Sequence, residues 1–587
     1  MNQQWQLLPP APDEYLSACG LSPLIAQLLY NRGVKADEAE PFLAADHRLD
    51  HNPFLLPDMS QAVSRIYKAL LSREKVAIYG DFDVDGVTAT AILVEGLSWL
   101  GEEGGPTQHH TLSGEGRVVP YIPDRFYEGR GLQPPAIEEL HSQGVSLVIT
   151  VDCGISNLAE TKQAQGMGID IIITDHHIPP ATLPQAIAVI DSKRKDSRYP
   201  YPDLAGVGIA FKLLQALFHK DDRKRRLTKL LDLVALGTVT DLVPLVGENR
   251  YLVKEGLKML NNTHRIGLQE MIRLAGLELG KLDTKHISKA LGPRLNAAGR
   301  IEHASTSYRL LTTRSTEEAH DLAAELEELN TERQQLSNEV LSKAKERLIY
   351  RTYPPLLIEG DESYPIGIIG LVAGELVDEF GKPAVILNLG PKICRGSCRS
   401  IPEFNIVSAL GKCHDLLTTF GGHPSAAGFT LARENLAKLE ERLMSLAMSE
   451  LSHLDLHPKL VIDAEIPLSA LADDTFNLIQ LLSPFGQGNP QPTFLSRQVE
   501  VLKRRNFGSQ GEWLELKLKQ GDVTWRAAYF DSQKAREGGR PTQRHPLSGE
   551  EREEIPSHID IVYNLEKSWR NGEEVLQLNL RDFAPSQ

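Results

Sequence analysis

Four short apolar segments in the first half of the chain each run directly into an acidic residue. They are VAIYG at 76–80, LVITV at 147–151, IIIT at 171–174 and IAVI at 187–190. Runs this short, rich in Val and Ile and separated by helix-length segments, are typical of buried parallel strands. We therefore predict an α/β fold with a parallel sheet. The carboxyl ends of its strands should meet at one edge, where such sheets bind ligands.

The residues that follow these segments predict a metal site at that edge. They read DFDVDG at 81–86, DCG at 152–154, DHH at 175–177, and Asp191. Carboxylates packed this closely repel one another, and divalent cations relieve the repulsion. Asp and His donors without clustered Cys suit manganese or magnesium better than zinc, and two such ions would support phosphoryl displacement. NTP-driven or NAD chemistry has no motif here, because neither GxxxxGK[ST] nor GxGxxG occurs in the right context.

Parts of the cluster also have a simpler interpretation. DFDVDG could be an acidic turn that caps the following helix through its dipole. If the turn instead stays extended, Asp83 and Asp85 point towards one site. Adjacent histidines can be structural, but beside Asp175 they favour two roles, in which one ligates metal and the other faces the substrate.

Length and composition set the broad class. The 587 residues suggest about four domains at ~150 residues each. Apolar and charged fractions of 41% and 24% are ordinary for a soluble globular protein, and the five cysteines are too scattered for a disulfide framework. Without an apolar run of about 18 residues or a secretion signal, we expect a cytoplasmic protein. The net charge of -15 argues against indiscriminate coating of nucleic acid, but not against a nucleic-acid enzyme.

The pattern along the chain divides it into five regions. The segment from Thr316 to about Tyr350 has helical spacing, dense charge and no Gly or Pro, which predicts a long connecting helix capped by Ser315 or Thr316. After His457, short strands with repeated turns predict a small barrel. The expected regions are an N-terminal lead-in at 1–60, the first α/β domain at 61–314, the helix at 315–352, a smaller α/β domain at 353–455 and the barrel at 456–587.

The motifs DFDVDG, VDCGIS, TDHH and ALGTVTDLVPL, in that order, resemble those of the DHH phosphoesterase superfamily. Further segments resemble its bacterial exonucleases specific for single-stranded DNA, and the resemblance covers about residues 20–585. These segments are YIPDRF at 121–126, LAGVGIAFK at 204–212, LGPRLNAAGRI at 291–301, RGSCRS at 395–400, FGGHPSAAG at 420–428 and SPFGQGNPQPTF at 483–494. The resemblance implies a DHH domain, a DHH-associated domain and a C-terminal OB-fold.

The resemblance also implies the residues of the catalytic centre. His177 would orient or polarise the scissile phosphate, and His423 would bind a phosphate near the cut. Asp241 by itself could merely cap a helix, and only the resemblance gives it a larger role. Many superfamily members carry His two residues before the first Asp, where this chain has Tyr79. The two metal ions would be held by Asp81, Asp83, Asp85, Asp152, His176 and Asp241, with Asp152 as the bridge.

Substrate contacts follow from the same resemblance. RGSCRS is expected to be a loop that cradles the 5′-terminal phosphate through backbone N–H groups, with Ser397, Arg399 and Arg125 as contacts. Gly421 and Gly422 would allow close backbone approach. Arg294, Asn296 and Arg300 either contact substrate or lock the domain edge. The candidates for stacking on bases are Phe507, Trp513, Trp525 and Phe530, although most aromatic residues in a small barrel are core.

We therefore expect a metal-dependent exonuclease that degrades single-stranded DNA from its 5′ end to 5′-mononucleotides, in recombination and repair. Direction and biology rest on the resemblance. The expected partners are single-stranded DNA, a single-strand-binding protein and a helicase, with no membrane. Two rival hypotheses are a phosphodiesterase for short oligonucleotides or cyclic dinucleotides and a non-catalytic replication scaffold.

Overall fold

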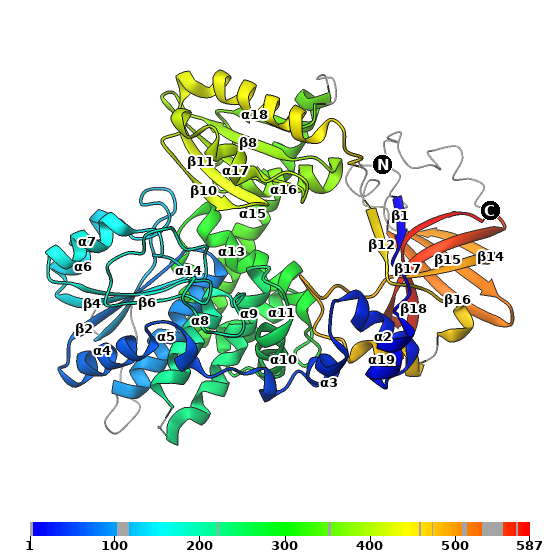
Figure 1. Ribbon diagram of the computed structural model, residues 1–587, viewed down its shortest axis with the longest axis horizontal. Coiled ribbons are helices and arrows are strands. Elements are labelled where there is room, and N and C mark those ends of the chain that lie inside the picture. The colour runs from blue at the N-terminus through cyan, green and yellow to red at the C-terminus, as the bar shows by residue number, and fades with distance from the viewer. Residues whose placement is uncertain are drawn as a thin grey trace. The chain divides into compact units, whose positions relative to one another are not determined.

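The chain folds into two compact units (Figure 1). One contains Met1–Ala44, Asp455–Phe485 and Asn489–Gln587, and the other contains Ala45–Leu454 with Gly486–Gly488. The computed structural model describes residues 4–101, 117–219, 222–349, 354–456, 459–471, 473–507, 513–530, 556–570 and 573–586. Among these residues, none of the helices has the length and apolar character needed to cross a bilayer.

The first α/β domain of the larger unit contains a parallel sheet, as predicted. Its strand order is β3-β2-β4-β5-β6, and every neighbouring pair is parallel. The four predicted strands are present, and the edge strand β3 was not predicted. The strands are β2 (Lys75–Gly80), β3 (Val118–Tyr121), β4 (Val145–Val151), β5 (Asp170–Thr174) and β6 (Ala188–Ile190).

Helices cover both faces of this sheet. Val76 and Ile78 pack in one core, whereas Ala77 and Tyr79 pack in another, as the alternation of side chains along a strand requires. The first core is built with α4 (Met59–Leu71), α5 (Val84–Gly101) and α8 (Gly206–Leu217), and the second with α6 (Pro134–Ser142) and α7 (Leu158–Gly166). Further helices follow at α9 (Leu231–Thr240), α10 (Gly247–Leu260), α11 (Ile266–Leu274), α12 (Thr284–His286), α13 (Gly292–Ile301) and α14 (Ser305–Thr312).

The predicted connecting helix is α15 (Thr316–Ile349). Its start is capped by Ser315, whose Oγ accepts a hydrogen bond from the N–H of Glu318 at 3.2 Å. The helix packs against α11, α13 and α14 of the first α/β domain. It also packs against α16 (Ile369–Phe380) and β7 (Leu357–Asp361) of the second. It therefore joins the two α/β domains, as expected.

The second α/β domain has a mixed sheet in the order β10-β11-β9-β8-β7, in which only β7 and β8 are parallel. The expectation of a phosphate-cradling loop at 395–400 is wrong. Most of that segment is strand β9, which is paired on both sides, so its backbone N–H groups are used within the sheet. The elements are β7 (Leu357–Asp361), β8 (Ala384–Leu389), β9 (Ile393–Arg399), α17 (Ile406–Gly411), β10 (Thr419–His423), β11 (Ala426–Ala432) and α18 (Leu436–Leu451).

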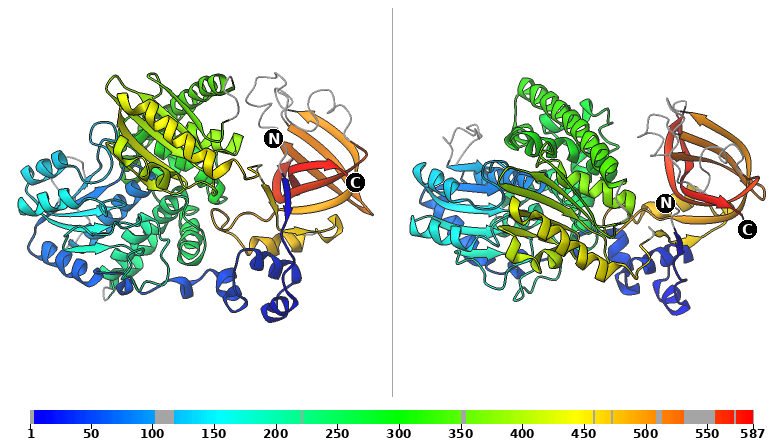
Figure 2. Two further views of the ribbon diagram at one scale, coloured as in Figure 1. Left: turned by 45° about the horizontal axis from the view of Figure 1, so that its top comes forward. Right: turned by 90° about the horizontal axis from the view of Figure 1, so that it is seen from above.

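The smaller unit is a closed barrel, as predicted. Its strands run in the order β14-β15-β16-β18-β17, and β17 pairs with β14 to close the sheet. Figure 2 shows these strands, orange to red, curving round into the barrel. They are β14 (Phe494–Phe507), β15 (Trp513–Gln520), β16 (Val523–Phe530), β17 (His558–Arg570) and β18 (Glu573–Pro585), with β13 (Ala464–Glu465) beside β14 and α19 (Asp473–Gln480) before it.

The N-terminal segment, expected to lead into the first α/β domain, lies in the barrel unit up to Ala44. Strand β1 (Gln4–Leu7) pairs in parallel with β12 (Lys459–Ile462). The buried guanidinium of Arg32 donates to Asn489 Oδ1 at 2.8 Å and pairs with Asp463 at 3.2 Å. Three short helices complete the segment: α1 (Asp13–Cys19), α2 (Pro23–Asn31) and α3 (Ala39–Ala44).

Candidate metal centre

The carboxyl ends of the neighbouring strands β2, β4 and β5 bring the predicted ligands together. Asp152 and His176 each belong to two of three overlapping groups, and the ligand atoms of a group lie within 4.8 Å of one another. The prediction that these strand ends converge is therefore confirmed. The groups are Asp152, His176 and His177; Asp85, His176 and Asp241; and Asp81, Asp83 and Asp152.

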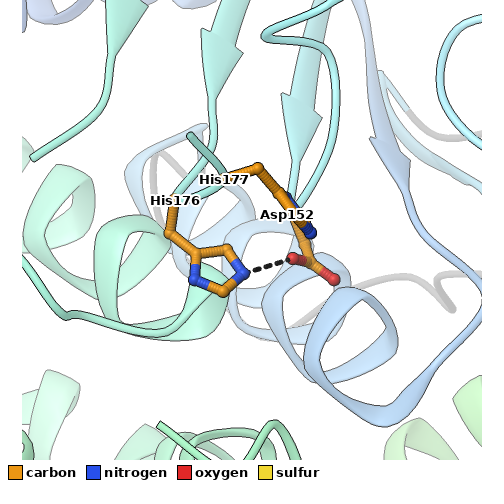
Figure 3. Close-up of side chains that lie close together, drawn as sticks. All are labelled: Asp152, His176 and His177. Carbon is orange, nitrogen blue, oxygen red and sulfur yellow. Dashed lines mark ion pairs between the residues drawn. The ribbon is translucent and has the colours of Figure 1, made fainter. Parts of the chain in front are cut away.

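His176 lies at the centre of the carboxylates. Its Nε2 is 3.1 Å from Asp152 Oδ1, 3.6 Å from Asp241 Oδ2 and 3.8 Å from Asp85 Oδ2. Figure 3 shows the His176 ring turned towards the Asp152 carboxylate. Burial lowers the pKa of His176 well below its usual value, so the imidazole is neutral, as a metal ligand must be.

Three atoms of this group suit a bound cation. Within the described residues, both ring nitrogens of His176 and Oδ1 of Asp152 are buried without a hydrogen-bond partner. Buried polar atoms normally have one, so these atoms fit ligands of an ion. The residues present therefore fit the divalent metal that the family resemblance implies.

The carboxylates give the same indication. Burial, with Asp83 as the next cause, raises the pKa of Asp85 to about 7. Burial also raises the pKa of Asp152 and of Asp241 well above the usual value, and the charge of Asp85 adds to both. Like charges held together in a buried site are stabilised by a divalent cation, because it neutralises them without protonation.

Asp83 and Asp85 do not share one extended turn, contrary to the conditional expectation. Helix α5 already begins at Val84. Asp83 Oδ1 accepts from the N–H groups of Asp85 at 3.1 Å and Gly86 at 3.3 Å, so Asp83 also caps this helix. The consequence is that Asp83 groups with Asp81 and Asp152, whereas Asp85 groups with His176 and Asp241.

Asp85 is held by a second helix. Its two carboxylate oxygens accept from the N–H of Gly206 at 2.6 Å and of Val207 at 2.8 Å, at the start of α8. The positive end of that helix dipole favours the charged carboxylate. Both hydrogen bonds fix the orientation of Asp85 within the cluster.

His177 has a partner that sequence reasoning did not assign to the site. Asp175 is buried, and its Oδ1 lies 2.7 Å from His177 Nδ1 while also accepting from the N–H of His176 at 2.8 Å. Burial lowers the pKa of His177, but the charge and hydrogen bond of Asp175 outweigh it and raise the pKa overall. Asp175 was visible as the first residue of DHH, and only its hydrogen bonds reveal its role.

His423 from the second α/β domain reaches the same place. Its ring stacks on that of His177, with centroids 5.6 Å apart and planes at 17°. Burial, followed by the charge of His177, lowers the pKa of His423. The two stacked rings therefore differ in their affinity for a proton, and His177 is the readier to carry one. They lie where the two α/β domains meet.

Arginines gather beside the metal cluster. Phe82 stands in the chain between the metal-ligand candidates Asp81 and Asp83, and the guanidinium of Arg125 lies 4.9 Å from the centroid of its ring. Burial lowers the pKa of Arg300 to about 9, and the charges of Arg125 and Arg399 contribute. Buried like charges of this kind favour an anion.

Ser397 and Arg399 belong to the same region, because the charge of Arg399 acts on Arg125 and on Arg300. They lie two residues apart on β9, and a Cβ on Gly370 would lie 2.8 Å from Ser397 Oγ and 3.5 Å from Arg399 Nη2. Gly370 is in the first turn of α16, so both side chains face the N-terminal end of a helix, which favours anions.

The remaining predicted substrate contacts are occupied within the protein. Arg294 binds Glu327 of α15 at 2.5 and 3.0 Å, and Asn296 Oδ1 accepts from the N–H of Val84 at 3.1 Å. Gly422 has φ 142, and an added Cβ would lie 2.3 Å from Ala426 O. Gly421 in the same hairpin has open space around it. Arg294 thus ties α13 to α15 and Asn296 contacts the start of α5, while Gly422 is needed for its turn.

The aromatic candidates of the barrel are not equivalent. Trp525 donates from Nε1 to Leu468 O at 3.1 Å, which ties it to the fold. The rings of Trp513 and Phe530 pack at 4.6 Å between centroids, and Phe530 is among the exposed apolar residues. The side chain of Phe507 lies outside the part of the chain that the structure describes.

Comparison with known proteins identifies domains in the same order. Residues 75–238 match the DHH family N-terminal domain, 353–448 the DHHA1 domain and 462–582 the RecJ OB domain. The barrel is therefore an OB-fold, and the three-part fold class predicted from the sequence is confirmed.

Individual relatives agree along nearly the whole chain. The single-stranded-DNA-specific exonuclease RecJ of Bacillus subtilis is 36% identical over 556 residues, which cover 94% of this chain and 68% of the relative. The enzyme of the same name from Escherichia coli is 33% identical, over 87% of this chain and 89% of the relative. The crystal structure of RecJ in complex with Mn²⁺ from Thermus thermophilus superposes with a TM-score of 0.79 at 28% identity, covering 100% of this chain and 80% of that one.

Proposed function

Because the chain belongs to the RecJ family of single-stranded-DNA-specific exonucleases, we propose that it is a metal-dependent exonuclease that hydrolyses single-stranded DNA from the 5′ end. The observation that carries the direction is the group of arginines beside the candidate metal ligands. The charges of Arg125, Arg300 and Arg399 act on one another, and Ser397 and Arg399 lie beside Gly370 at the start of α16. A terminal phosphate, which has more charge than an internal phosphodiester, suits such a group best.

In this proposal the arginine group and the carboxylates together would account for release of single nucleotides. Phe82 links them, since it lies between Asp81 and Asp83 and its ring packs under Arg125. A 5′-phosphate held by the arginines would place the next phosphodiester bond over the carboxylates. Cleavage there releases one 5′-mononucleotide and leaves a new 5′-phosphate for the following cycle.

The metal ligands in this proposal are Asp83, Asp85, Asp152, His176 and Asp241, with Asp152 shared. When bound, two divalent ions supply a deprotonated water and stabilise the charge on the leaving oxygen. Asp85 is kept in position by α8, and His176 is kept neutral by burial. The protein thus holds Asp85 in the orientation, and His176 in the neutral state, that ions of this kind require.

The stacked histidines would act on the scissile phosphate. Asp175 accepts a hydrogen bond from His177 Nδ1, which leaves Nε2 to face the substrate and favours the charged ring. A charged His177 can donate a hydrogen bond to a phosphate oxygen as its negative charge grows. His423, whose pKa is lowered, would accept or donate beside it without adding a second full charge.

The biological setting in this proposal follows from the family. We place the enzyme in the cytoplasm, in recombination and repair of DNA. A single-strand-binding protein and a helicase are proposed partners, because the substrate must be unwound and is usually coated. The OB-fold would bind the single strand, with Trp513 and Phe530 as the candidates for stacking on bases.

Labelled strands test the proposal. With Mn²⁺, a 5′-labelled single strand should lose its label as mononucleotide at once, whereas a 3′ label should appear only when the strand is nearly consumed. A 5′-phosphorylated strand should be cut faster than a 5′-hydroxyl strand, and Arg399→Gln should remove that preference. Arg442→Gln, which breaks a surface pair with Asp415, is the charge-matched control.

Two results would contradict the proposal. Early release of the 3′ label would reverse the direction, and equal digestion of blunt duplex would remove the specificity for single strands. Hydrolysis of cyclic dinucleotides without degradation of long strands would instead favour a small-substrate phosphodiesterase.

A further inference from the structure

Arg130 is a charged residue at the metal cluster that the sequence motifs did not single out. It lies between Gly129 and Gly131, whose φ values of 90° and 78° are in the left-handed region. A Cβ on Gly131 would lie 2.6 Å from Asn157 Oδ1, and the carbonyl of Gly131 accepts from Tyr79 OH at 2.9 Å. The two glycines therefore allow a tightly held turn that presents Arg130 to the cluster.

The guanidinium of Arg130 bridges two carboxylates. Its Nε lies 2.5 Å from Asp81 Oδ2, and its Nη2 lies 3.2 Å from Asp83 Oδ2. The charges of Asp81 and then of Asp83 hold the pKa of Arg130 far above its usual value, so it is always a cation. A planar guanidinium suits this bridging role because its donors have a fixed fork geometry.

The contacts of the two carboxylates differ in a way that matters for metal binding. Asp81 is fully buried, with Oδ2 on Arg130 and Oδ1 accepting from the N–H of Phe82 at 2.8 Å. Asp83 is one-third exposed, and its Oδ1 already accepts from two N–H groups of α5. Oδ2 is therefore the Asp83 oxygen that is more available to a metal, and it is also the oxygen that pairs with Arg130.

We propose that Arg130 is a resident counter-ion that competes with a divalent ion for Asp83 and so weakens metal binding at this end of the cluster. Asp81 would then be the anchor of Arg130 rather than a metal ligand. A divalent ion at Asp83 must displace or share the guanidinium, and it meets the repulsion of a fixed positive charge. The inference rests on the proposed metal dependence, but not on the polarity or the substrate of the enzyme.

Titration of the DNA-free protein with Mn²⁺, followed by the electron paramagnetic resonance signal of free Mn²⁺, tests this. Arg130→Gln should tighten the weaker Mn²⁺ site by about 3- to 10-fold, the range expected for loss of one partly exposed charge interaction. Arg130→Lys keeps the charge but loses the fork that bridges both carboxylates, so it should tighten Mn²⁺ binding less than Arg130→Gln does. Arg273→Gln, which removes an equal charge from a surface pair with Glu270, is the matched control and should also leave binding unchanged.

The opposite outcome would overturn the inference. If Arg130→Gln unfolds at the same temperature as the wild type but binds Mn²⁺ equally well or more weakly, Arg130 only supports the loop. Arg130→Met serves as a second neutral replacement if the Gln variant does not fold. The half-exposed side chain makes both replacements tolerable for packing. Since Mn²⁺ binding is measured without DNA, failure here is separate from failure of the proposed exonuclease activity.

Discussion

Gly206 offers a sharp test of how the cluster is positioned. It begins α8, and a Cβ added to it would lie 2.7 Å from Asp152 Cβ and 2.9 Å from Asp85 Oδ2. Carbon atoms in ordinary contact are about 3.5–4.0 Å apart, so Gly206→Ala requires a displacement of roughly 1 Å. Asp152 has little room to retreat, because it has φ 60° and its N–H donates to Thr174 O at 3.1 Å.

The cost to stability should be small and the cost to activity large. Overpacking of this kind costs about 1–3 kcal/mol, and replacing Gly by Ala in a helix returns about 1 kcal/mol. The free energy of unfolding should therefore fall by only about 0–2 kcal/mol. Moving metal ligands by roughly 1 Å can cost about 100-fold in rate, so we expect kcat for Gly206→Ala to fall by about that factor.

Gly208→Ala in the same helix is the matched control. A Cβ there would lie 3.4 Å from Leu204 Cδ2, an ordinary contact, so this variant should be as active as the wild type. Denaturant unfolding gives the stability of both variants, and release of 5′-labelled mononucleotide with saturating Mn²⁺ gives kcat. If Gly206→Ala is as active as Gly208→Ala, the close approach of α8 to the carboxylates does not position them, and the reasoning fails.

Three further predictions concern single residues. Asp175→Asn should lower kcat by about 100-fold and lower the pKa of His177, measured by NMR, because the ring loses the acceptor that orients it; an unchanged pKa would contradict this. Arg294→Gln and Glu327→Gln should each lower the free energy of unfolding by about 1 kcal/mol, because the two residues form a structural ion pair. Neither change should raise KM for DNA, and a clear rise in KM for Arg294→Gln would show that Arg294 contacts the substrate. Burial raises the pKa of Asp85 to about 7, so in metal-free protein its contribution to stability is present below the unfolded pKa of about 3.9 and is lost as pH rises through about 7. Metal-free wild type should therefore lose more stability than metal-free Asp85→Asn between about pH 4 and 7, and parallel curves by denaturant unfolding would refute the shift.

The strands that could be predicted are those with strong hydrophobic patterns. The buried central strands and α15 show their periodicity in the sequence. Strand β3 has only four residues, so its pattern is too short to detect. Strand β9 contains Gly396 and several polar residues, which are typical of a loop, and only its pairing with β8 and β11 makes it a strand.

Local signals also could not separate the roles of neighbouring acids. Asp83 and Asp85 alternate in the sequence, yet the early start of α5 sends them to different groups. Arg130 stands in an ordinary Gly-Arg-Gly turn, and nothing nearby in the chain indicates its bridge to Asp81. Such pairings join residues distant in sequence, so they depend on the packing of whole elements.

By itself, the sequence determined the parallel sheet, the connecting helix, the barrel and the convergence of Asp152 and His176 as a divalent-metal site, because hydrophobic periodicity and motif chemistry are local properties. Asp241 was expected there only from the family resemblance. The tertiary structure alone decided which oxygen atoms remain available to a metal. Asp175 is hydrogen-bonded to His177, and a backbone N–H of α8 is hydrogen-bonded to Asp85. Arg130 forms ion pairs with Asp81 and with one oxygen of Asp83. The physical reason is that the availability of a buried oxygen depends on every donor within hydrogen-bond reach, and these donors come from separate parts of the chain.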